Sequence, residues 1–243
     1  MLEIELFTTM LAAICGADNI SPKSDVAMID SCQTCPSFTS NTGENGGEIE
    51  QIIYGSFTAP GIDEAVVDFH GCEAHVNNWG GSILLRRYEQ SWSMVRYEPG
   101  VRSLSCLTFS QDGLDSLVCE HSYVNQGYLV NWLNQLEFEP DRIGRTELIN
   151  VTSNTGSCRP PFYAVEIVET QSQDVNNDGL SDLVAVLTET RETSSENQSQ
   201  QMRCEPNLPE PTVHQLTFLF DGRSFTPTSQ TREKIAYLQS IGN

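Results

Sequence analysis

Basic side chains are scarce in this sequence. The 243 residues include thirteen Lys and Arg against thirty-three Asp and Glu, which gives a formal charge of −20. Only two of the bases are lysines, Lys23 and Lys234. A surface of this sign repels phosphate backbones and anionic lipid headgroups. The charge therefore argues against nucleic-acid binding and against docking on a membrane surface.

Long apolar runs are also missing. No segment approaches the roughly 20 consecutive apolar residues that a transmembrane helix needs, so no membrane span is expected. The apolar segment from Leu6 to Cys15 follows Glu3 and Glu5, and the first positive residue is Lys23. A secretory signal has basic residues ahead of its apolar stretch, so this N-terminus does not indicate an export route.

Motifs of known catalytic chemistry are absent as well. The chain has no Gly-x-Ser-x-Gly, no phosphate-binding glycine loop and no His-Glu-x-x-His. Acid pairs such as Asp63–Glu64 occur, but acids are so abundant that any one pair is expected by chance. Trp79, Trp92 and Trp132 are expected in the core or on a sheet face, and sugar binding by them is left open. The sequence thus favours a non-enzymatic protein.

Eight cysteines are spread along the chain, an even number that is typical of disulfides in an oxidising compartment. Cys106 and Cys119 stand at matching positions either side of a predicted hairpin turn at Asp112-Gly113, which predicts a cross-strand disulfide. A second bridge, Cys158–Cys204, is expected to anchor a long loop. Cys72 is expected to be bridged to one of the cysteines of the N-terminal leader.

Two other uses of these cysteines compete with disulfides. His70, Cys72 and His75 could form a zinc site with Cys32 and Cys35, but the clean second ligand pair of a zinc motif is missing. The Cys32–Cys35 pair could be a redox motif, yet no βαβ pattern surrounds it. Disulfides remain the favoured interpretation.

Alternating apolar and polar residues begin at Ile49 and predict an all-β fold. Residues 1–48 are predicted to be an irregular N-terminal leader, and residues 49–243 a β-repeat domain. Within that domain residues 189–211, rich in Glu, Gln, Ser and Pro, predict a long surface loop. Short helices are expected only near the ends, at Glu3–Ala13 and Thr231–Gln239. The expected strands are Gln51–Thr58, Glu64–Phe69, Ser82–Tyr88, Trp92–Tyr97, Leu104–Phe109, Ser116–Glu120, Tyr163–Val168, Leu183–Thr188 and Val213–Phe220.

A degenerate internal repeat runs through the β-rich part. Its complete copy spans residues 174–184, and weaker copies span residues 110–118 and 60–66. In each copy a glycine is followed by an aliphatic residue, then by acids or serine, and then by an aliphatic strand start. The glycines lie 52 and 66 residues apart, a spacing that suits one four-stranded blade of a β-propeller per copy.

The complete copy predicts a calcium loop. Asp174, Asn176, Asp178 and Asp182 stand at positions 1, 3, 5 and 9, with a glycine at position 6. Alternate oxygen side chains on a tight loop can converge on one hard cation, and the backbone carbonyl of Leu180 and water would complete its shell. Position 12 is alanine and both flanks have strand character, so the loop is not an EF-hand. A solvated hairpin turn is the competing interpretation.

This pattern, Asp-x-Asn-x-Asp-Gly-x-x-Asp followed by an aliphatic strand, resembles the FG-GAP/VCBS repeat family of integrin-α-like β-propellers. The resemblance covers residues 48–243, but only residues 174–184 match the motif closely. It implies antiparallel blades, about three of them in an open or incomplete arrangement. It also implies Ca²⁺ at Asp174, Asn176, Asp178 and Asp182.

These features together predict an exported calcium-binding β-repeat protein that is secreted, periplasmic or at the cell surface. Its expected role is a non-enzymatic module for binding, cell adhesion or surface assembly. The partner would be a protein or a glycan, or a second copy of the chain. The alternative is an exported metal-dependent hydrolase that uses acidic residues; its metal would keep an open position in a cleft, whereas a structural calcium loop supplies its ligands locally.

Overall fold

The computed structural model describes residues 2–20, 31–40, 46–73, 80–139, 141–192 and 204–242. These residues are mostly antiparallel β-structure in two sheets, with two α-helices, which confirms the predicted all-β class. The elements are α1 (Leu2–Cys15), η1 (Ala17–Asn19), β1 (Glu48–Gly55), β2 (Glu64–His70), β3 (Gly80–Tyr88), β4 (Ser91–Pro99), β5 (Cys106–Gln111), β6 (Leu114–Asn125), β7 (Tyr128–Phe138), β8 (Ile143–Ser153), β9 (Tyr163–Gln173), β10 (Asp182–Arg191), β11 (Thr212–Phe220), β12 (Phe225–Pro227), α2 (Ser229–Gln239) and η2 (Ser240–Gly242).

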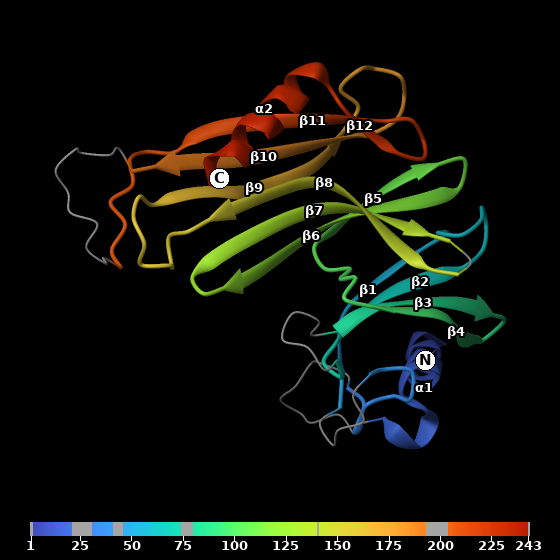
Figure 1. Ribbon diagram of the computed structural model, residues 1–243. Helices are drawn as coiled ribbons and strands as arrows, with labels where there is room; N and C mark the ends of the chain where they lie inside the picture. The colour runs from blue at the N-terminus through green and yellow to red at the C-terminus, as the bar shows by residue number, and fades with distance from the viewer. Residues whose placement is uncertain are drawn as a thin grey trace. The chain divides into compact units, whose positions relative to one another are not determined.

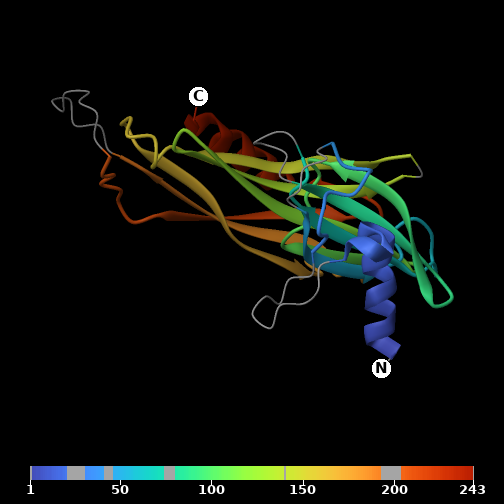
Figure 2. The same cartoon turned by 90° about the horizontal axis from the view of Figure 1, so that it is seen from below.

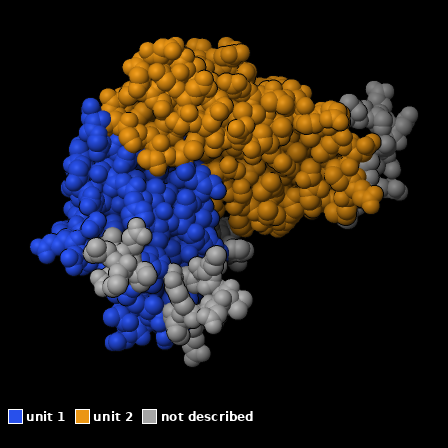
Figure 3. Space-filling view, turned by 180° about the vertical axis from the view of Figure 1, so that it is seen from behind, with its two compact units in different colours: residues 1–106, 112–119, 136–145 blue, residues 107–111, 120–135, 146–243 orange. Residues whose placement is uncertain are grey.

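The chain divides into two compact units, coloured separately in Figure 3. Unit 1 contains residues 1–106, 112–119 and 136–145, and therefore holds α1 and the sheet β1-β2-β3-β4. Unit 2 contains residues 107–111, 120–135 and 146–243, and holds β9 to β12 and α2. The chain passes from one unit to the other within strands β5 to β8.

Unit 1 is built around β2 and β3, which are buried on both faces. One face carries Val67 and Ile83 and packs against Met10, Leu11 and Ile14 of α1. The other face, with Val66 and Leu84, belongs to a second apolar cluster that includes Phe57 and Leu117. A strand that is covered on both faces has a nearly continuous run of apolar residues. For this reason apolar and polar residues alternate little in Glu64–His70. The N-terminal end of α1 projects away from the strands (Figure 2).

In unit 2, β10 pairs with β9 on one side and β11 on the other. Helix α2 packs against β11 (Figure 1). The helix begins after Thr228, whose side chain accepts a hydrogen bond from the Thr231 N–H, as an N-cap residue does. Phe109, Phe220 and Phe225 form a compact aromatic cluster, with ring centroids 4.7–5.8 Å apart.

Nine predicted strands correspond to β1–β6 and β9–β11, and both predicted helices are present. Three strands were missed, namely β7, β8 and the three-residue β12. In β7 the polar residues Asn131, Asn134 and Gln135 are buried, so the apolar–polar alternation that indicates a strand is absent. Of the predicted loop 189–211, residues 193–203 lie outside the described residues, and residues 204–211 hold neither helix nor strand.

The three copies of the repeat each fall on a turn between neighbouring strands, as predicted. Gly61, Gly113 and Gly179 all have positive φ, which glycine adopts without steric cost. The second and third copies belong to one sheet of eight strands, with order β12-β11-β10-β9-β8-β7-β6-β5. In the part of the chain that the structure describes, no closed propeller or blade arrangement is seen.

All eight cysteines are paired. The bonds are Cys15–Cys32, Cys35–Cys72, Cys106–Cys119 and Cys158–Cys204. This confirms the predicted cross-strand bridge, the bridge to residue 204 and the pairing of Cys72 with a cysteine near the N-terminus. No helix among the described residues is both long and apolar enough to span a membrane.

Removing the Cys35–Cys72 disulfide should destabilise unit 1 more than removing Cys106–Cys119. The bonds span 37 and 13 residues, and the unfolded chain gains more entropy when the longer loop is released. In the chain-entropy model each loss is about 2–4 kcal/mol, and the difference is about 1 kcal/mol. Urea unfolding of the two double Cys→Ala variants measures it; equal losses would contradict the loop-entropy argument.

Candidate functional site

The predicted calcium loop lies between β9 and β10, where its first side chain closes the turn. Asp174 accepts hydrogen bonds from two backbone N–H groups: Oδ1 from Asp178 at 3.2 Å and Oδ2 from Gly179 at 3.1 Å. Gly179 has φ +91° and Asn177 has φ +61°, so two residues in the left-handed region produce the sharp bend. The space that a side chain on Gly179 would occupy is open.

The side chains at positions 3 and 5 gather around the same short stretch of backbone. Asn176 Oδ1 accepts from the Asp178 N–H at 3.0 Å, and Asp178 Oδ1 accepts from the Leu180 N–H at 2.8 Å. The amide of Asn176 donates to Asp178 Oδ2 at 2.7 Å. Asp174, Asn176 and Asp178 therefore bring their oxygens to one exposed loop, and Leu180 is half-buried beside them.

Asp182 differs from the other predicted ligands because it is fully buried. Its Oδ2 accepts from the Val175 N–H at 3.0 Å, and its Oδ1 accepts from the Phe220 N–H at 2.9 Å. One carboxylate thus joins the start of the loop, the start of β10 and the end of β11. Each of its oxygens holds a backbone amide, so Asp182 anchors the loop in this structure.

The first copy of the repeat contains the same anchor. Glu64 is buried at the start of β2 and accepts from the Phe57 N–H at 2.8 Å, seven residues earlier, as Asp182 accepts from Val175 seven residues earlier. In both copies the turn glycine stands three residues before the acid. The strand registers also agree, since Gly55 is opposite Glu64 and Gln173 is opposite Asp182.

The first copy keeps the anchor without the carboxylate ligands. Ser56, Thr58 and Pro60 stand where Asp174, Asn176 and Asp178 stand in the third copy. The Thr58 hydroxyl donates to Glu64 Oε1 at 2.6 Å, and Arg86 pairs with the same oxygen at 2.9 Å. The acid anchor therefore forms in the first copy without acidic residues at the ligand positions.

The donors of the third copy suit a hard cation in part. Asp174, Asn176 and Asp178 supply two carboxylates and one amide oxygen within one loop, and oxygen donors of this kind are what Ca²⁺ takes. No group of three or more His, Cys, Asp or Glu side chains capable of holding a metal occurs in the described ranges. A bound ion would need the amide of Asn176, backbone carbonyls and water to complete its six to eight oxygens.

The disulfides rule out the alternative in which these cysteines bind zinc. Cys32 is bonded to Cys15, and Cys35 to Cys72, so none of the three thiols that it required is available as a thiolate ligand. His75 lies outside the described residues. The redox interpretation of the Cys32–Cys35 pair fails for the same reason, because the two cysteines are not bonded to each other.

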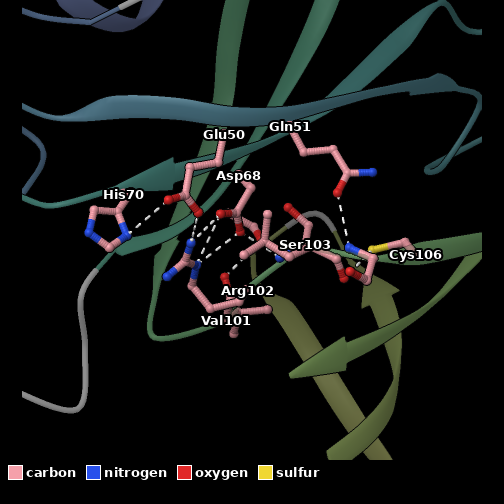
Figure 4. A network of polar contacts seen from close by, with 11 residues as sticks. Glu50, Gln51, Asp68, His70, Val101, Arg102, Ser103 and Cys106 are labelled. Atoms are coloured by element: carbon pink, nitrogen blue, oxygen red, sulfur yellow. Dashed lines mark hydrogen bonds and ion pairs between the residues drawn. The ribbon is translucent and has the colours of Figure 1, made fainter. Parts of the chain in front are cut away.

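A buried ionic network holds the segment that follows β4 (Figure 4). The fully buried Asp68 carboxylate accepts from the Arg102 guanidinium at 3.0 Å and from the Ser103 N–H at 2.7 Å. Glu50 accepts from Arg102 at 2.6 Å, and its other oxygen lies 3.4 Å from His70 Nδ1. Burial alone would lower the pKa of Arg102, but the hydrogen bonds and charges of Asp68 and Glu50 raise it above its ordinary value, so the guanidinium keeps its charge.

A second cluster, which the sequence did not predict, lies in unit 2. Glu189 of β10 receives hydrogen bonds from Arg191 at 2.7 Å and from the Tyr237 hydroxyl of α2 at 3.1 Å, and its other oxygen lies 2.9 Å from His214 Nε2. Burial by itself would raise the pKa of Glu189, but these three partners hold it below its ordinary value of 4.5. The residues come from three elements far apart in sequence, so no local pattern could have indicated the cluster.

Replacing Asp182 and replacing Asp178 should have different effects on stability when calcium is absent. Asp182→Ala leaves the buried Phe220 N–H and the part-buried Val175 N–H without acceptors, and we expect a loss of about 2–4 kcal/mol in excess chelator. Asp178→Ala removes an exposed side chain and should cost less than about 0.5 kcal/mol under the same conditions. Urea unfolding measures both; equal effects would mean that Asp182 is not an anchor.

The Glu189 cluster should make unit 2 sensitive to acid. Because folding lowers the pKa of Glu189, its contribution is present above pH 4.5 and is lost as the pH falls through the folded-state pKa. Glu189→Gln should flatten the fall in unfolding free energy below about pH 4.5. A matched variant on the same sheet, the exposed Glu169→Gln, should keep the slope of the parent; an unchanged slope in Glu189→Gln would contradict the assignment.

Comparison with known proteins gives no relative. No protein-family model matches the chain, and neither a curated protein nor a solved structure is similar to it above the level of chance. The resemblance to FG-GAP/VCBS repeats therefore stays a prediction. It rests on residues 174–184, on the strands either side of them and on the weaker copies upstream.

Proposed function

We propose that this protein is an exported, calcium-binding β-repeat protein that acts as a non-enzymatic binding or adhesion module. The observation that carries the proposal is the loop between β9 and β10. There Asp174, Asn176 and Asp178 direct oxygen atoms to one short stretch of backbone. The loop is already fixed by Asp182, so cation binding needs no large rearrangement of the chain.

The bound Ca²⁺ would be held by Asp174, Asn176 and Asp178, with the Leu180 carbonyl and water. Asp182 would not need to touch the ion; its bonds to backbone amides would hold the loop in position. When bound, the ion would stiffen a hairpin end that is otherwise exposed. All of these ligands come from one loop, which is the arrangement of a structural site and not of a catalytic metal in a cleft.

The repeat supports one calcium per chain. The first copy has Ser56, Thr58 and Pro60 in place of the ligands, and the second is a two-residue turn at Asp112-Gly113. We propose that the feature shared with FG-GAP/VCBS repeats is the anchored hairpin. In it, an acid stands three residues after the turn glycine, and this acid holds the loop that precedes it. A propeller would need several separate blade sheets packed around one axis, in addition to the two sheets described above.

Export is supported by the four disulfides, which persist in oxidising compartments and are rare in the cytosol. The charge of −20 suits a medium rich in cations, which screen repulsion between acids. Both features fit a protein that is secreted, periplasmic or displayed at a cell surface.

Calcium should raise the thermal stability of the oxidised protein. A ligand that binds only the folded state adds about 2.7 kcal/mol at one hundred times its dissociation constant. We expect the Tm to fall when excess chelator replaces calcium, and Asp178→Ala to show no difference between the two conditions.

The matched control is Glu169→Ala, which removes one exposed acid of β9 outside the loop and should keep the full calcium response. Scanning calorimetry of the three proteins gives the answer. The calcium proposal is wrong if chelator leaves the parent Tm unchanged, or if Asp178→Ala keeps the shift.

A further inference from the structure

Unit 1 has a hollow that none of the features above explains. It measures about 370 Å³ and lies at the end of the β1–β4 sheet that carries the β1–β2 turn. This volume falls in the range of small-molecule sites and suits a ligand of one ring. Its lining comes from all four strands and the β1–β2 turn, namely Tyr54, Gly55, Ser56, Asp63, Glu64, Arg87 and Trp92.

The polar side chains of the hollow differ in how fully their hydrogen-bonding groups are occupied by other parts of the protein. Glu64 is buried and bonded to the Phe57 and Thr58 amides and to Arg86, so it is part of the rigid floor. Asp63 and Arg87 form a looser pair, with Oδ2 and Nη1 3.7 Å apart and the side chains 72% and 38% exposed. That distance exceeds a direct hydrogen bond, so each group keeps capacity for a ligand. The Arg87 guanidinium is oriented by a 3.1 Å bond from Nε to the Glu89 carbonyl.

The apolar wall consists of two aromatic rings. Tyr54 is 58% exposed, and its ring centroid lies 6.0 Å from that of Trp92 at an angle of 44°. Trp92 is only 6% exposed, and its indole N–H is buried with no hydrogen-bond partner within the described ranges. The hollow therefore combines the partly exposed ring of Tyr54, a buried tryptophan beside it and a separated acid–base pair.

We infer that this hollow binds one neutral sugar residue. A pyranose ring has an apolar face of C–H groups that can lie on the exposed ring of Tyr54, and hydroxyls at its edge. One hydroxyl can donate to Asp63 while it accepts from Arg87, bridging the gap between them with charge-assisted bonds. Asp63 and the strongly negative chain disfavour anionic ligands, and a purely apolar ligand would desolvate the Asp63–Arg87 pair without replacing its water.

The inference rests on the proposed binding role, but it concerns a different unit from the calcium loop. The hollow lies in unit 1 and the loop in unit 2, so each can fail alone. Sugar binding should be the same in calcium and in chelator. Loss of the calcium response would leave the hollow intact, and absence of sugar binding would leave the calcium response intact.

Saturation-transfer difference NMR on the full-length, oxidised protein tests the inference. The probes are the methyl glycosides of glucose, galactose and mannose, and N-acetylglucosamine, each at millimolar concentration. We expect at least one probe to receive saturation, mainly at the C–H protons of one ring face. Tyr54→Ala should weaken its binding about tenfold and Asp63→Asn should also weaken it.

Tyr88→Ala is the matched control, because Tyr88 is 54% exposed on β3 but does not line the hollow. It should bind the probe as the parent does, and circular dichroism melts should show all three variants folded. The inference is overturned if no probe is saturated, if Tyr54→Ala binds as well as the parent, or if Tyr88→Ala loses binding to the same extent.

Discussion

Glu64, Asp68 and Asp182 are buried carboxylates that each accept hydrogen bonds from backbone N–H groups of a neighbouring loop. A buried charge is tolerated only when its oxygens are satisfied, so each acid requires its loop to adopt one conformation. Glu64 fixes the β1–β2 turn, Asp68 the segment after β4, and Asp182 the loop before β10. Arg86 and Arg102 also pair with Glu64 and Asp68, whereas both oxygens of Asp182 accept from backbone amides.

The two proposed sites both depend on these anchors. In the proposed calcium loop, Asp182 holds Val175 and the end of β11, and the oxygens of Asp174 and Asp178 lie on the exposed part of the loop. The hollow of unit 1 has a rigid floor because Glu64 holds the residues that follow β1. The same feature, an acid three residues after a turn glycine, thus supports the proposed cation site in the third copy of the repeat and the proposed ligand hollow in the first. The disulfides add stability to both units.

The sequence predicted what depends on local pattern: the all-β class, nine strands, both helices and three features of the disulfide pairing. It missed β7 because Asn131 and Gln135 occupy buried positions, where only tertiary hydrogen bonds make polar side chains acceptable. Spacing did not reveal that Asp182, one of the predicted ligands, is buried with both oxygens bonded to backbone amides. In the sequence, Asp63 and Glu64 are indistinguishable from a chance pair of acids. The strand register identifies Glu64 as the anchor, because Glu64 occupies the position that Asp182 occupies in the third copy, whereas Asp63 is its exposed neighbour.

Amide hydrogen exchange in excess chelator tests most directly whether buried carboxylates, and not a metal, hold the loops. The account predicts strong protection of the Phe57, Val175 and Phe220 amides, whose acceptors are Glu64 and Asp182, and fast exchange at the exposed Asp178 amide. Protection of Val175 that appears only when calcium is added would contradict the account, because the metal would then be what orders the loop.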